Sequence, residues 1–122
     1  MNIPLYNEQV AFEDKTLWQI ENAAMPASIG VVIASTADFP LQKGTVMGKV
    51  TATGKYLPYV DGAVDGTGTA VGLLNEHVDE LRLSSTNQDV TSTIGVIGVA
   101  IEASCVGLDA AAKVDLKTIV FV

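Results

Sequence analysis

The feature that most constrains the fold is a series of short strand-like runs separated by glycine turns between residues 41 and 74. Residues 45–50 and 56–60 are β-branched or aromatic runs of strand length, and residues 70–74 (AVGLL) return to an apolar run. Glycine accepts a positive φ, and an aspartate side chain can hydrogen-bond to the backbone near it. Turns are therefore predicted at Lys43-Gly44, Gly54, Asp61-Gly62 and Asp65-Gly66. The stretch therefore predicts a β scaffold, and it carries no reacting group.

Further strands are predicted on both sides of this stretch. Residues 28–35 (SIGVVIAS) form a strand that opens the main domain, and residues 118–122 (TIVFV) end the chain as another. Residues 90–106 are almost continuously apolar or β-branched, which predicts one strand that is buried on both sides or bent at Gly95 and Gly98. Left exposed, the apolar C-terminal strand would be an aggregation-prone edge, so it is expected to be buried.

Two short helices are predicted. Thr16 and Gln19 have the spacing of a capping box, and Pro26 marks the end of the helix that follows. Residues 108–117 contain helix-forming residues at helical spacing. The expected fold is therefore mainly β with one or two short helices (α+β), a compact β-sandwich or barrel. The expected division is an N-terminal arm with a short helix, residues 1–27, and a β-rich domain, residues 28–122.

Composition narrows the class of protein. A chain of 122 residues forms one core, and its 48% hydrophobic content with only 17% charged residues suggests that some apolar surface meets another chain. The net charge of −7 repels phosphate groups, so no nucleic-acid partner is expected. No run is long enough for a membrane helix and the N-terminus does not resemble a signal peptide, so we expect synthesis in a cytoplasm and no membrane partner.

The residues that could carry chemistry do not form a catalytic pattern. Gly66 and Gly68 lack the third glycine of a dinucleotide-binding loop, and an EF-hand that began at Asp61 would have Gly72 where it needs a carboxylate. Cys105 lies in an apolar run, far in sequence from the single histidine, His77. We therefore expect a protein that is not an enzyme and has no catalytic residue, metal or cofactor.

The order LxKGTVxGKVTxTGKYxPY, then a polar glycine loop and AVGLL, resembles the head decoration proteins of tailed bacteriophages, the lambda type. The similarity extends over roughly residues 29–122 and includes the final helix and I-V-F-V ending. It implies a small β-rich structural protein of the virion that binds the outer surface of the expanded capsid as a homotrimer. Its implied partners are the major capsid protein and itself, at (quasi-)three-fold sites, where it stabilises the shell against packed DNA. The protein would be made in the host bacterial cytoplasm.

The N-terminal segment has two interpretations. It is either a frayed terminus or an arm that adds as a strand to a sheet edge of the major capsid protein. The stretch before Ile29 is longer than the arm of the lambda protein, which leaves open whether the whole arm docks or only the residues before about Glu13. The side chains expected to contact the capsid are apolar or aromatic: Ile3, Leu5, Tyr6, Val10, Phe12 and Trp18.

The alternative class is a small β-barrel carrier or ligand-binding module. A carrier would need a functional lysine, and Lys49, in Met47-Gly48-Lys49-Val50, or Lys55 would supply it. The Met-Gly-Lys-Val sequence lies within a predicted strand and lacks the second methionine of a carrier motif. The structural class is favoured mainly because of the family resemblance.

Overall fold

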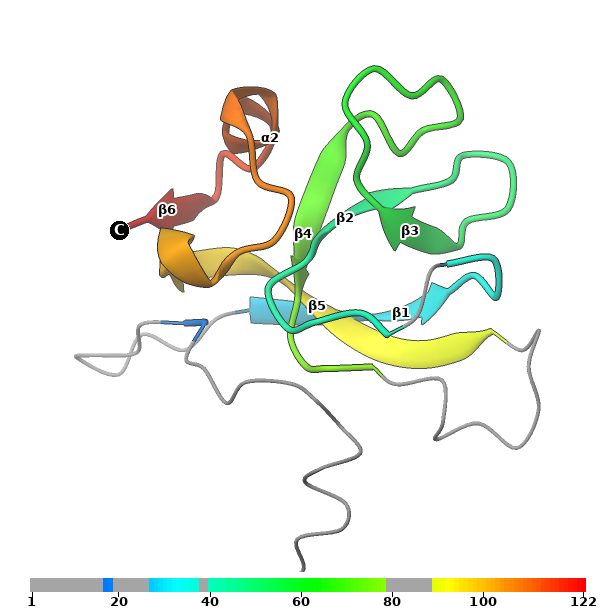
Figure 1. Cartoon of the computed structure of the whole chain (residues 1–122), viewed down its shortest axis with the longest axis horizontal. Helices are drawn as coiled ribbons and strands as arrows, with labels where there is room; N and C mark the ends of the chain where they lie inside the picture. The colour runs from blue at the N-terminus through cyan, green and yellow to red at the C-terminus, as the bar shows by residue number, and fades with distance from the viewer. Residues whose placement is uncertain (1–16, 19–26, 38–39, 79–88) are drawn as a thin grey trace, which may run out of the picture.

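A computed structural model describes residues 17–18, 27–37, 40–78 and 89–122, which form a β-barrel with a helix at its side (Figure 1). The elements in chain order are β1 (Ala27–Ile33), β2 (Val46–Lys49), β3 (Tyr56–Pro58), β4 (Ala70–Leu74), β5 (Val90–Ala100), the 3-10 turn η3 (Glu102–Ser104), α2 (Ala110–Asp115) and β6 (Ile119–Phe121). Five strands close in the order β1–β3–β2–β4–β5, because β5 also pairs with β1. β6 extends the sheet by pairing with β5 in parallel. The expected mainly β, barrel-like fold is confirmed.

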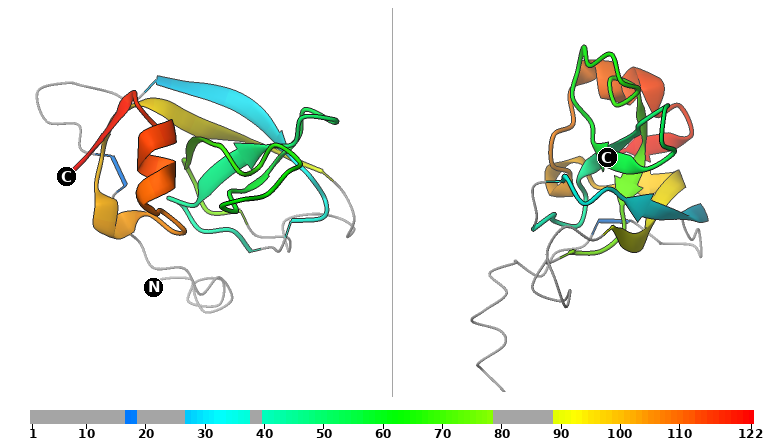
Figure 2. Two further views of the ribbon diagram at one scale, coloured as in Figure 1. Left: turned by 90° about the horizontal axis from the view of Figure 1, so that it is seen from above. Right: turned by 90° about the vertical axis from the view of Figure 1, so that its right-hand side faces the viewer.

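β5 is the strand that joins the parts of the barrel. Its residues 90–97 pair with β1 on one side and, at Ile94 and Gly95, with β4 on the other. Its last residues, 98–100, pair with β6. Figures 1 and 2 show β5 running the length of the molecule, with α2 and β6 beside one end of it. The segments predicted as strands at residues 28–35, 45–50, 56–60 and 118–122 become β1, β2, β3 and β6, each within two residues of its predicted ends.

The strand predicted for residues 90–106 is too long, because β5 ends at Ala100. The backbone N–H of Ile101 donates to the carbonyl of Leu17 at 2.8 Å, and that of Glu102 donates to the carbonyl of Val122 at 3.0 Å. Beyond these bonds the chain turns into η3, which the bond from Cys105 N–H to the Glu102 carbonyl closes. Contacts with both ends of the sequence therefore set the end of this strand.

The prediction of an N-terminal helix is wrong for Leu17 and Trp18, the two residues of that segment that the structure describes. Trp18 forms an antiparallel bridge with Ala100, so the chain is extended there. The remaining residues of this prediction, including Thr16, Gln19 and Pro26, lie outside the described residues. The helix predicted over residues 108–117 is confirmed in a shorter form as α2. The proposed boundary at residues 27 and 28 stays a prediction.

Two clusters of buried side chains form the core. One fills the barrel: Val31, Ile33, Leu41, Met47, Tyr56, Leu74, Val78 and Ile94. The other lies between the barrel, α2 and β6: Leu17, Val46, Tyr59, Ala70, Leu73, Ala100, Ala112, Leu116 and Ile119. Leu17 is only 2% exposed in the second cluster, so its side chain packs with the core of the barrel and α2.

Two carboxylates hold α2 against the barrel. Asp109 caps the helix by accepting from the N–H of Ala112 at 2.7 Å, and it also accepts from the Tyr59 hydroxyl at 3.0 Å. Burial raises the pKa of Tyr59 above its usual value, and the neighbouring Asp109 carboxylate raises it further. The hydroxyl therefore stays protonated and remains a donor. At the other end of the helix Asp115 accepts from the backbone N–H of Ala70, the first residue of β4. The helix is too short to be stable without such contacts.

We predict that Asp109→Ala lowers the free energy of unfolding by about 1–2 kcal/mol, since it removes the helix cap and leaves the buried Tyr59 hydroxyl without its acceptor. Urea denaturation followed by far-UV circular dichroism measures the change. Asp109→Asn is the matched control, because asparagine caps helices equally well and still offers an oxygen to Tyr59. Equal loss in both variants would contradict the assignment of the stabilisation to these hydrogen bonds.

The weakest joint of the barrel is the contact between β1 and β3, which consists of the parallel pair Ile33 and Tyr56. Asp89 spans this joint. Its carboxylate accepts from the N–H of Ser35, just after β1, at 2.9 Å and lies 2.7 Å from the ammonium of Lys55, just before β3. The hydrogen bond from Lys55, and then that from Ser35, lowers the pKa of Asp89 below its ordinary value of 3.8.

A carboxyl group with a lowered pKa stabilises the fold above its unfolded-state pKa, and this contribution disappears as the pH falls through the folded-state value. We therefore predict that Asp89→Asn lowers the urea midpoint slightly at pH 7, and that the difference from wild type shrinks below about pH 4. The effect is small because both side chains are partly exposed to solvent. Glu76→Gln removes the charge of another exposed carboxylate and is the control; a difference that is independent of pH would argue against the ionised Asp89 bridge.

Candidate functional site

Of the six side chains predicted to contact a capsid, the structure describes only Trp18. The others, Ile3, Leu5, Tyr6, Val10 and Phe12, lie outside the described residues. Trp18 is half-buried beside the core cluster that contains Leu17, and its indole N–H donates to the side-chain oxygen of Asn75 at 2.9 Å. Its direct contact with a capsid stays a prediction. The structure thus places residues 17 and 18 beside the end of β5.

An apolar patch lies on the outer face of β5 and β6. Val99 and Val120 are paired neighbours, and alternation along the strands places Ile97 and Val122 on the same face. Ile97 is 52% exposed, Val120 58% and Val122 60%. We call these four residues the β5–β6 patch. Among the described strands β6 pairs with β5 alone, so the patch adjoins an open strand edge. A surface of this kind is typical of contact with another protein.

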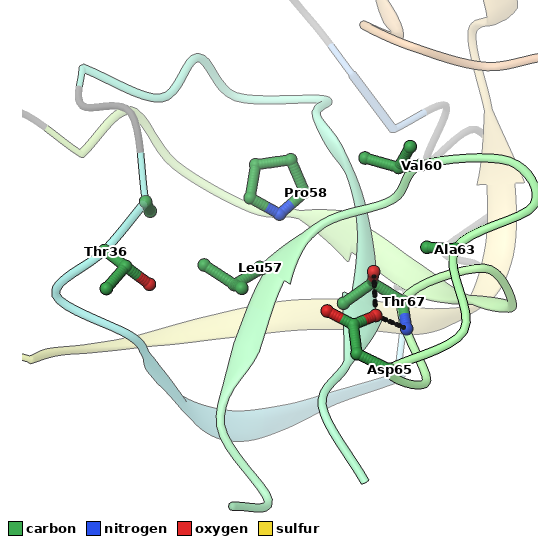
Figure 3. Close-up of a pocket in the computed structure, with 8 residues that line it drawn as sticks. Thr36, Leu57, Pro58, Val60, Ala63, Asp65 and Thr67 are labelled. Carbon is green, nitrogen blue, oxygen red and sulfur yellow. Dashed lines mark hydrogen bonds between the residues drawn. The ribbon is translucent and has the colours of Figure 1, made fainter.

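The other notable surface feature is an open hollow of about 310 Å³ between β3 and the loop that follows it (Figure 3). Its lining is mainly apolar: Thr36, Ala37, Leu57, Pro58, Val60, Ala63, Asp65 and Thr67. The carboxylate of Asp65 accepts from both the backbone N–H and the hydroxyl of Thr67, and these bonds lower the pKa of Asp65. A carboxylate engaged in this way shapes the turn, as the glycine–aspartate pattern predicts.

Gly66 shows why this turn requires glycine. Its φ is +112°, and a Cβ atom there would overlap the backbone oxygen of Lys49. The N–H of Thr51 donates to the carbonyl of Asp65 at 2.9 Å, which fastens the loop to the turn after β2. Among the described residues, His, Cys, Asp and Glu side chains form no group of three that could hold a metal ion. The left-handed conformation of Gly66 and the bond from Thr51 make this loop part of the scaffold.

The lysines of the alternative carrier function lie in structural contacts. Lys55 forms the ion pair with Asp89, and Lys49, the last residue of β2, has its ammonium 5.8 Å from the centre of the Tyr56 ring. His77 accepts from the backbone N–H of Lys43 at 3.0 Å, and Cys105 is partly buried against the core. These arrangements show no specific feature of a carrier or a nucleophilic site.

Fold and surface together define a small β-barrel whose described surface offers an apolar patch and an open strand edge, the features of a structural binding protein. The family model of the bacteriophage lambda head decoration protein D matches residues 15–118, so the chain belongs to that family. It is a structural protein of the phage capsid, located on the outer surface of the head. No curated protein matches the chain. No helix in the described ranges is long and apolar enough to cross a membrane.

Sequence reasoning missed the contacts that hold the chain at residues 17 and 18. Asn75, Gly95 and Ala100 all meet Trp18, yet each is far from it in sequence. The only available signal was the presence of an apolar pair, Leu17-Trp18, before the first strand. The family match begins at residue 15 and therefore includes this pair but leaves out residues 1–14.

Proposed function

We propose that the protein binds the expanded phage capsid as trimers at (quasi-)three-fold sites and stabilises it against the pressure of packed DNA. The observation that carries this proposal is the family match over residues 15–118. A decoration protein can strengthen the expanded shell against outward pressure when one rigid body holds neighbouring capsid subunits together. The closed barrel suits this role, because its strands form a ring and share a continuous hydrogen-bond network.

We also propose that residues 1–14 form an arm that adds to a strand of the major capsid protein. The apolar residues Ile3, Leu5, Tyr6, Val10 and Phe12 would supply side-chain anchors, while the backbone would supply strand pairing. Burial of Leu17 supports this division of roles, since it ties the chain to the barrel shortly after the proposed arm. Three arms on one trimer would multiply weak individual contacts.

Assembly into a cyclic trimer requires two different complementary surfaces on each subunit. The β5–β6 patch is suited to be one of them, because it combines exposed apolar side chains with an open edge. The low proportion of charged residues, 17%, also fits a chain that buries surface against its neighbours.

Deletion of residues 1–14 tests the arm. We predict that the shortened protein keeps its fold, because these residues precede the buried Leu17, but no longer attaches to capsids. Co-sedimentation with expanded, undecorated capsids of the parent phage measures bound copies, and circular dichroism checks the fold. A double variant, Leu5→Ser with Tyr6→Ser, should weaken binding, whereas Asn7→Ser with Gln9→Ser should not. A shortened protein that saturates capsids like wild type would refute the arm.

A matched pair of valine substitutions tests the β5–β6 patch. Val120→Asp places a charge in the patch, whereas Val64→Asp places the same charge on a fully exposed loop residue. We predict that Val120→Asp lowers the trimer fraction at least tenfold, because an unpaired charge is costly to bury, and that Val64→Asp leaves it unchanged. Because the proposal places the trimer on the capsid, co-sedimentation with expanded, undecorated capsids followed by cross-linking measures the trimer fraction of bound protein. Equal fractions in wild type and both variants would show that the patch is outside the interface.

A further inference from the structure

The indole ring of Trp18 lies against the backbone of β5 at Gly95. A Cβ atom on Gly95 would overlap the Cζ2, Cη2 and Cε2 atoms of the ring, so any other residue at this position would displace it. Gly95 pairs with Ser28 of β1 and Leu73 of β4, which places it where three strands meet. Because Gly95 has no side chain, the ring of the only tryptophan in the sequence can lie directly against the β5 backbone.

Asn75 fixes the other edge of the ring. Its side-chain oxygen accepts from the Trp18 Nε1–H at 2.9 Å, and its side-chain NH₂ donates to the Ser28 hydroxyl at 2.9 Å and to the Thr93 hydroxyl at 3.0 Å. The backbone N–H of Asn75 also donates to the carbonyl of Thr93 at 3.1 Å. These four hydrogen bonds to three partners hold the Asn75 side chain in one orientation. Its side-chain oxygen therefore has a fixed position, at which it accepts from the indole N–H of Trp18.

The backbone is held at the same point. Trp18 is bridged to Ala100, and the carbonyl of Leu17 accepts from the N–H of Ile101 at 2.8 Å. The Leu17 side chain is buried with Ala100 in the core. The chain thus meets β5 twice, at residues 17–18 and again at β1, whose first residue, Ala27, pairs with Ile97.

We propose that Trp18, Gly95 and Asn75 form an arm clamp that fixes where the N-terminal arm leaves the barrel. Trp18 is then a positioning residue: it acts through its seat on the barrel and not by touching the capsid. This inference rests on the proposed function, in which residues 1–14 bind the major capsid protein. It gives the half-buried indole a role different from that of the apolar residues nearer the N-terminus.

The expected size of the effect follows from the length of the tether. In the sequence, 16 residues precede Leu17 and 26 precede Ala27, where β1 begins, so an arm held only from β1 has a longer tether than an arm held at Leu17. The effective concentration of a tethered group falls roughly as the −3/2 power of tether length, which gives about a twofold loss for each arm. If all three arms of a trimer engage, the loss multiplies to about eightfold.

The experiment compares capsid affinity among four full-length variants and the protein lacking residues 1–14. Trp18→Ala removes the ring, Gly95→Ala displaces it, and Trp18→Phe restores an aromatic ring without the N–H. Thr91→Ala is the control, because Thr91 is an exposed residue of the same strand and has no part in the clamp. Tryptophan fluorescence reports the position of the ring in Gly95→Ala, and urea midpoints show whether the barrel is intact.

We expect Trp18→Ala and Gly95→Ala to bind capsids about two- to tenfold more weakly, with Trp18→Phe intermediate, because it keeps a ring but loses the bond to Asn75, and Thr91→Ala close to wild type. A red-shifted emission in Gly95→Ala would show that the ring has moved. The anisotropy of a dye on the N-terminal amine should fall in both weakened variants, a change that loss of barrel stability alone would not produce.

Two results would overturn the clamp, and they differ in what they say about the arm. Wild-type affinity in Gly95→Ala despite a displaced ring, with binding lost on deletion of residues 1–14, would refute the clamp alone. Wild-type affinity after the deletion would refute the arm and the clamp together. If Gly95→Ala does not fold, Trp18→Ala decides by the same criteria.

Discussion

The structure depends on the way in which β5 shares its hydrogen bonds. One strand of 11 residues pairs with β1, β4 and β6, and its end also meets residues 17 and 18. Both core clusters lie against it, one through Ile94 and the other through Ala100. Because the strand joins the barrel to α2, β6 and the N-terminal segment, a distortion of β5 would disturb all of them together.

The parts of this fold that could be predicted from sequence are those set by local chemistry. Glycine and aspartate in the 61–66 stretch predict a turn, and the structure shows the reason in the left-handed φ of Gly66 and the hydrogen bonds of Asp65 to Thr67. Strand positions followed from β-branched runs, since such side chains favour extended backbone. The family resemblance correctly supplied the class of protein.

The parts that could not be predicted are set by partners far away in the chain. β5 stops at Ala100 because the next two N–H groups donate to Leu17 and Val122, near opposite ends of the sequence. The extended conformation at Trp18 overrides a good helix-capping pattern for the same reason, since packing on β5 outweighs a local preference. Closure of the barrel between β1 and β3, through the single pair of Ile33 with Tyr56, likewise could not be predicted from the sequence.

The proposed function requires a rigid body together with a segment that reaches the capsid, and the placement of Leu17 and Trp18 bears on how one chain could combine the two. Burial of Leu17 and the contact of Trp18 with Gly95 hold these two residues against the barrel. Under the proposal, the residues of the arm have to match the capsid, whereas Leu17 and Trp18 have to match the packing of β5. The family match includes residues 17 and 18 and leaves out residues 1–14, as this division of roles predicts.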